Sequence, residues 1–143
     1  MAKSENRHIE KIGILGGTFD PPHKGHLKIS QIAKKKFDLK MIIWAITRKN
    51  PFKKRSFFDL NKRIKLSKIL TKKQKYIKIV FFEKKINSNK TISLIKYFKS
   101  KSKKKEIYFL LGADNLVNFH KWNNWKKIPK ICKIVVFDRN GFK

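Results

Sequence analysis

The chain has 143 residues, of which 41% are hydrophobic, so it is long enough for one domain with its own core and too short for two comfortable ones. It holds no apolar run near the roughly 20 residues of a membrane-spanning helix, no signal-like apolar segment near Met1, and no partner for Cys132, so we expect a cytoplasmic protein without disulfides or membrane contact. The formal net charge of +29 favours anionic ligands, whether phosphorylated small molecules or nucleic acid.

Short apolar runs alternate with amphipathic stretches along the chain, and each kind predicts one type of element. Asp59 and Thr91 are placed to cap two of the predicted helices. In chain order we predict a strand at 12–15, a helix at 27–37, a strand at 41–46, a polar loop at 47–57, a helix with Leu60, Ile64, Ser67 and Leu70 on one face, a strand at 76–82, a turn at 87–90, a helix at 91–100 with Ile92, Ile95 and Phe98 inward, a strand at 107–111, a short helix, a helix at 122–128 closed by Pro129, and a strand at 132–137.

This alternation predicts an α/β fold: a Rossmann-like, doubly wound sheet of about five parallel strands with helices on both faces. After a polar N-terminal extension at 1–10, residues 11–143 form one domain without an internal linker or repeat. Ligands of such sheets bind beyond the carboxyl ends of the strands, where the strand order switches. The loops after the first, second and fourth strands are therefore the places to look for a site.

The loop after the first strand, residues 16–26, reads GGTFDPPHKGH. Gly16 and Gly17 fit either a tight turn with positive φ or the close approach of a phosphate to the backbone. His23 and His26 are three residues apart at a helix start, so both rings can meet one anion beside the helix N-terminus. A metal site is the rival interpretation, but no third ligand stands at a suitable spacing, and paired helical ligands are more often four residues apart.

The segment resembles the H-x-G-H signature of the nucleotidyltransferase superfamily, which class I aminoacyl-tRNA synthetases share. The signature leaves several members open, including pantetheine-phosphate adenylyltransferases and small cytidylyltransferases. The former usually carry Thr at the position of His23, which disfavours them. Three further segments resemble the bacterial nicotinate-nucleotide adenylyltransferase family: 49–53 (KNPFK), Thr91 at a helix start, and 111–125, which begins LGADNL and includes FHKW. The resemblance extends from Ile12 to Phe142.

This resemblance implies transfer of AMP from ATP to nicotinate mononucleotide, giving deamido-NAD and pyrophosphate in NAD biosynthesis, with Mg²⁺ accompanying ATP. It implies that His23 and His26 are catalytic. ATP would be bound by those histidines and by Gly16, Gly17, Thr18, Phe19, Gly112 and Asp114. The mononucleotide would be bound by Asn50, Lys53, Thr91 and Trp122.

Each of three later residues has a simpler interpretation that stays open. Lys53 is one of many lysines in the chain, Asp114 follows a strand end where it could cap a helix, and the Trp122 indole could be part of the core. Trp44 and Trp125 are expected to pack. Other functions also remain: an amidated mononucleotide as acceptor, an RNA-binding module of the same fold, or an inactive remnant.

The positive charge does not by itself identify a nucleic-acid partner. Lysines recur in every segment, only five of the 38 basic residues are arginine, and the abundance of Lys, Ile, Asn and Phe is typical of an AT-rich genome. No stacking platform of interleaved aromatics accompanies them, so we do not expect nucleic acid to be the partner. Members of the nicotinate-nucleotide adenylyltransferase family, which this chain resembles, continue past the fifth strand with an I-S-[ST]-T-x-[IL]-R type motif. The chain stops at Lys143 without it, so we expect a domain incomplete at its C-terminus.

Overall fold

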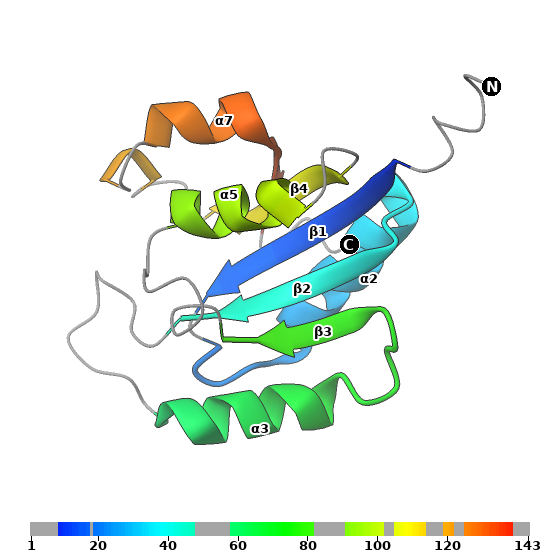
Figure 1. Cartoon of the computed structure of the whole chain (residues 1–143). Helices are drawn as coiled ribbons and strands as arrows, with labels where there is room; N and C mark the ends of the chain where they lie inside the picture. The colour runs from blue at the N-terminus through cyan, green and yellow to red at the C-terminus, as the bar shows by residue number, and fades with distance from the viewer. Residues whose placement is uncertain are drawn as a thin grey trace.

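The computed structural model describes residues 9–17, 19–47, 58–81, 91–101, 105–113, 119–121 and 125–138. Within these ranges, five parallel strands form one sheet in the order β3-β2-β1-β4-β5 (Figure 1). The predicted α/β sheet is confirmed. The strands are β1 (Glu10–Gly17), β2 (Met41–Ile46), β3 (Ile77–Val80), β4 (Lys105–Gly112) and β5 (Lys133–Phe137).

The strand order reverses between β1 and β4. From β1 the chain moves outward through β2 to β3, and it then returns to the other side of β1 to form β4 and β5. In β1, Leu15 pairs with Leu110 of β4, and both strands end two residues further on, at Gly17 and Gly112. The carboxyl ends of these neighbouring strands therefore lie at the switch point, where ligands of α/β sheets bind.

Helices cover both faces of the sheet (Figure 1). Helices α2 (Lys24–Phe37) and α3 (Leu60–Leu70) pack on one face, and α5 (Thr91–Lys101) and α7 (Ile128–Ile131) pack on the other. Successive residues of a strand point to opposite faces. Accordingly, Ile14 belongs to the α5 side of the core and Leu15 to the α2 side. This double cover explains why the buried middle of β1, the whole of β2 and the middle of β4 are apolar.

Most predicted elements are confirmed, and one is wrong. The helix predicted at 122–128 and closed by Pro129 is instead a 3₁₀ turn, η2 (Trp125–Lys127), followed by the short helix α7. Pro129 lies in the first turn of α7, where a helix does not use the backbone N–H that proline lacks. A second 3₁₀ turn, η1 (Phe119–Lys121), precedes η2. The predicted turn at 87–90 and the predicted loop at 47–57, apart from Thr47, lie outside the described residues.

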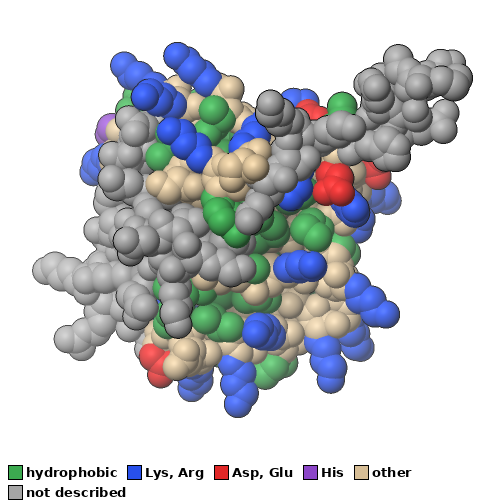
Figure 2. Space-filling view, in the orientation of Figure 1, with side chains coloured by type: hydrophobic (Ala, Val, Ile, Leu, Met, Phe, Trp, Pro, Cys, Tyr) green, Lys and Arg blue, Asp and Glu red, His purple; other side chains and the backbone are tan. Residues whose placement is uncertain are grey.

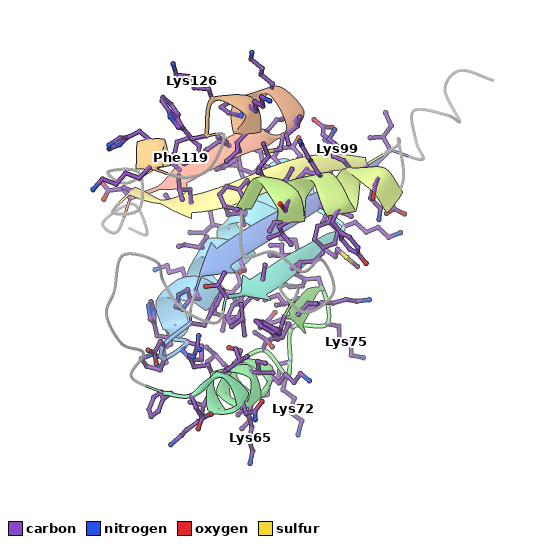
Figure 3. All side chains as sticks on the ribbon, turned by 60° about the vertical axis from the view of Figure 1, so that its left-hand side comes forward. Lys65, Lys72, Lys75, Lys99, Phe119 and Lys126 are labelled. Atoms are coloured by element: carbon purple, nitrogen blue, oxygen red, sulfur yellow. The ribbon has the colours of Figure 1, made fainter. Side chains whose placement is uncertain are left out.

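The described lysines spread over both helical layers. Figure 2 shows Lys and Arg side chains at the top, right and bottom of the face in view, with few acidic side chains among them. In Figure 3, Lys65 projects from α3 and Lys72 from the turn that follows it, whereas Lys99 and Lys126 project on the opposite side of the sheet. Over the ranges the structure describes, no helix has both the length and the hydropathy needed to cross a membrane.

Candidate active site

The glycine pair at the end of β1 is extended backbone. Neither Gly16 nor Gly17 has a positive φ, so the tight-turn interpretation is wrong, and the left-handed residue is Phe19, with φ 52°. Added Cβ atoms would meet ring carbons no closer than 3.6 Å, which is ordinary contact. Neither the backbone nor crowding therefore demands glycine here. Thr18, between Gly17 and Phe19, lies outside the described residues.

The two histidines form a reciprocal cap at the N-terminus of α2. His23 is the N-cap residue, and its Nδ1 accepts a hydrogen bond from the backbone N–H of Gly25 at 3.0 Å. The His26 Nδ1 accepts one from the backbone N–H of His23 at 3.1 Å. This is the geometry of a capping box, built from imidazoles in place of a hydroxyl and a carboxylate.

The capping bonds decide which ring nitrogen can serve a ligand. In a neutral imidazole one nitrogen carries the proton and the other accepts. Since Nδ1 of both His23 and His26 accepts from a backbone amide, the proton of each neutral ring resides on Nε2. The ring centroids are 4.0 Å apart and the planes are tilted by 35°, so the predicted pairing of the two rings on one face is confirmed. The pair can offer two N–H donors to one anion.

Aromatic side chains hold the His26 ring from behind. Phe19 lies 4.5 Å from it, centroid to centroid, and Trp44 lies 5.8 Å away. Phe19 and Trp44 stack on each other at 4.9 Å, and both are buried. The Trp44 indole donates to Ser30 Oγ at 2.8 Å, and Ser30 Oγ donates to the backbone carbonyl of His26 at 2.9 Å. Trp44 packs in the core, as predicted, and also supports the site.

This environment sets the charge of His26. Burial, and then the nearby His23, lowers the pKa of His26 to about 3. The ring is therefore neutral at physiological pH, and it can act as a hydrogen-bond donor without carrying a positive charge. His23, by contrast, is exposed at the helix end.

Gly25 is required by the conformation of His23. A Cβ at Gly25 would lie 2.7 Å from His23 Cε1 and 2.8 Å from His23 Nδ1, distances that real Cβ atoms essentially never show. Any side chain at Gly25 would therefore push the capping imidazole out of place.

The structure places some of the other predicted site residues and not others. Gly112 ends β4 beside β1 at the switch point, and Thr91 is the first residue of α5. Thr18, Asn50, Lys53, Asp114 and Trp122 lie outside the described residues.

The residues that the sequence did not single out are Ser30 and Arg63, both fully buried on the inner faces of α2 and α3. Ser30 stands four residues after His26, on the same helix face, which was the available signal.

Metal-binding groups are few near the histidines. The described ranges contain no group of three His, Cys, Asp or Glu side chains that could hold a metal ion. Both Nδ1 atoms are already engaged with backbone amides, which leaves one nitrogen per ring. The arrangement suits an anion contacted by two donors better than a metal cage built by the protein.

Residues 14–142 match the model of the cytidylyltransferase-like family, so the class of the protein is that of the nucleotidyltransferases with this fold. A Pelagibacter ubique protein named as a nicotinate-nucleotide adenylyltransferase is 59% identical over 146 aligned residues, which cover 100% of this chain and 81% of that protein. A Ruegeria protein of the same name is 35% identical, over 91% of this chain and 68% of its own length. The chain belongs to the nicotinate-nucleotide adenylyltransferase family.

Solved structures share the fold. A Vibrio parahaemolyticus protein bearing the same enzyme name superposes with a TM-score of 0.75 at 19% identity, covering 90% of this chain and 74% of that one. A Plasmodium falciparum nicotinic acid mononucleotide adenylyltransferase, solved in complex with NaAD, superposes with a TM-score of 0.77 at 22% identity, covering 94% and 67%. These likenesses show that the chain shares its fold with both proteins.

Proposed function

We propose that this chain transfers AMP from ATP to nicotinate mononucleotide, and that His23 and His26 bind the phosphates of ATP during the transfer. A phosphate oxygen of the mononucleotide attacks the α-phosphorus of ATP, and the bond from that phosphorus to the bridging oxygen breaks to release pyrophosphate. Both the nucleophile and the leaving group are phosphate oxyanions, so no protein nucleophile is needed. The protein has to align two polyanions and stabilise the charge on the leaving oxygens.

The observation that carries this proposal is the pair of Nε2 donors at the N-terminus of α2. Backbone N–H groups at a helix start and the helix dipole favour a phosphate at this position. His26 is neutral because burial lowers its pKa, so it donates a hydrogen bond without having to lose a proton. The leaving pyrophosphate needs hydrogen bonds rather than a proton, and a neutral donor such as His26 meets that need.

The remaining contacts are proposed from the family resemblance. Gly16, Gly17, Thr18 and Phe19 would line the phosphates, and Gly112 and Asp114 would contact the ribose of ATP. Asn50, Lys53, Thr91 and Trp122 would bind the mononucleotide. Mg²⁺ would enter with ATP as part of the substrate, held by phosphate oxygens and water. We propose the cytoplasm as the site of this reaction.

The test is turnover by the wild type and by single histidine variants. With ATP, Mg²⁺ and nicotinate mononucleotide, the wild type should form deamido-NAD and pyrophosphate in equal amounts. His23→Ala and His26→Ala should each lower kcat by about 10²- to 10³-fold, the usual effect of removing one charge-stabilising donor. Lys65→Ala, an exposed change on α3, is the control and should keep wild-type turnover. Wild-type turnover by both histidine variants would refute the role of the imidazoles.

The acceptor is tested separately. Nicotinate and nicotinamide mononucleotides should be compared at equal concentrations, and a strong preference for the amide would contradict the proposed acceptor. RNA binding is the alternative that the charge of +29 favours. RNA binding that persists at raised salt and does not respond to ATP would support that alternative.

A further inference from the structure

A buried arginine lies behind the glycine loop. Arg63, on the inner face of α3, is 1% exposed, although arginine is almost never fully buried unless its charge is paired or hydrogen-bonded. Its Nε donates to the backbone carbonyl of Phe58 at 3.1 Å, and its Nη1 donates to the backbone carbonyl of Thr47 at 2.7 Å. One guanidinium thus joins the residue after β2 to a residue just before α3.

Thr47 and Phe58 are themselves bonded to the loop that follows β1. The backbone N–H of Thr47 donates to the carbonyl of Gly17 at 2.8 Å. The backbone N–H of Phe58 donates to Oδ1 of Asp20 at 2.6 Å. Arg63 is therefore linked through one residue to each side of Phe19, the left-handed residue of this loop.

We infer that Arg63 is a positioning residue for the catalytic loop: through Thr47 and Phe58 it fixes Gly17 and Asp20, and thereby the approach to His23. Asp20 precedes His23 by three residues, and both residues between them are prolines, Pro21 and Pro22, whose φ angles are fixed. A displacement of Asp20 would therefore be passed on to the capping imidazole. The inference rests on the proposed function for its effect on turnover, but the bonds themselves do not depend on it.

The geometry requires arginine. The guanidinium presents several N–H groups in a rigid plane and so can serve two carbonyls in different directions, whereas a lysine offers one nitrogen on a flexible stem. A lysine side chain is therefore not equivalent at this position, and Arg63→Lys should retain only part of what Arg63→Met loses. Ser67 supplies a matched control on the same helix face. It is fully buried, and its Oγ donates to the carbonyl of Arg63 at 2.8 Å, so Ser67→Ala disturbs α3 without removing either bond of the guanidinium.

The experiment compares the full chain as wild type, Arg63→Met, Arg63→Lys and Ser67→Ala. Amide hydrogen exchange of Thr47 and Phe58 reports whether their N–H bonds to Gly17 and Asp20 persist when Arg63 is replaced. Urea unfolding of each variant supplies the correction for global stability. Steady-state turnover with ATP and nicotinate mononucleotide supplies kcat and KM. Asp20→Ala, which removes the acceptor of the Phe58 N–H, probes the same linkage from the other side and is available if Arg63→Met does not fold.

We expect Arg63→Met to accelerate exchange at Phe58 beyond the change in global stability, and to lower kcat by about 100-fold with a smaller change in KM, since small misplacements cost this much. Arg63→Lys should fall between it and the wild type, and Ser67→Ala should keep wild-type kcat. The double variant Asp20→Ala/Arg63→Lys should show a smaller fold-loss of kcat than the product of the fold-losses of the two single variants. The reason is that both substitutions act through Phe58.

Two results overturn the inference: unchanged exchange at Phe58 in Arg63→Met, or the same loss of kcat in Ser67→Ala at matched stability. A wild type without adenylyl transfer would instead contradict the proposed function, and the exchange data would still decide whether Arg63 holds the loop.

Discussion

The neutral state of His26 predicts that the protein loses stability in mild acid. Burial lowers the pKa of His26 to about 3 in the folded chain, against an ordinary value of 6.5 in the unfolded chain. Between these values the unfolded state binds the proton and the folded state does not, so stability falls as the pH falls through 6.5 and levels off below 3. Linkage gives a loss of about 2 kcal/mol between pH 7 and pH 5 from this one group.

His26→Asn isolates that contribution. An Asn Oδ1 can take the place of the His26 Nδ1 that accepts the His23 N–H, so the substitution keeps the cap and removes the titrating ring. Urea unfolding of both proteins at pH 7 and pH 5 gives four free energies. The change from pH 7 to pH 5 should be more unfavourable in the wild type by about 2 kcal/mol. Subtracting the free energy of unfolding at pH 7 from that at pH 5 within each protein cancels the pH-independent cost of the lost ring packing. Equal changes in the two proteins would refute the assignment of a buried, neutral His26.

Three further outcomes are expected. Gly25→Ala should lower kcat sharply while the thermal midpoint moves little, because the new Cβ displaces the His23 ring and the lost cap is offset by the better helix propensity of alanine; a wild-type kcat would contradict the clash. Ser30→Ala should reduce the free energy of unfolding by about 1–3 kcal/mol, measured in urea, because it removes the acceptor of the buried Trp44 indole N–H. Cys132 should react slowly with a thiol reagent at pH 8 in the native protein and rapidly in urea, because burial raises its pKa to about 11; equal rates would contradict its burial.

The sequence predicted the strands and the pairing of the histidines because both depend on local pattern. A short, continuous apolar run is typical of a parallel strand that is buried on both faces. Accordingly, β2 has the predicted bounds of Met41–Ile46. The pairing of His23 and His26 follows from their spacing at the helix start, although His23 is the N-cap residue with extended backbone and its ring is placed by the cap.

The capping roles of the two rings could not be predicted in the same way. Histidine is not among the preferred N-cap residues, and whether an imidazole folds back on the helix depends on a rotamer. The role of Gly25 follows from that same rotamer, since its missing Cβ matters only when the His23 ring lies over it. The burial of Arg63 could not be predicted for another reason. On an amphipathic helix with many lysines, a basic residue is expected to face solvent. Its burial depends on two carbonyls from segments that only the tertiary fold brings together.

The overall charge and the charge of the site act at different distances. The lysines spread over both layers create a positive field that attracts phosphorylated substrates, but such a field is screened by salt within about 10 Å and selects no orientation. His26 adds nothing to that field, because its pKa of about 3 keeps it neutral. What it contributes is direction, since its Nδ1 is engaged by the backbone and Phe19 and Trp44 pack behind its ring. A rigid neutral donor stabilises a phosphate oxygen only when that oxygen is correctly placed, and this is the property that in-line transfer between two polyanions requires.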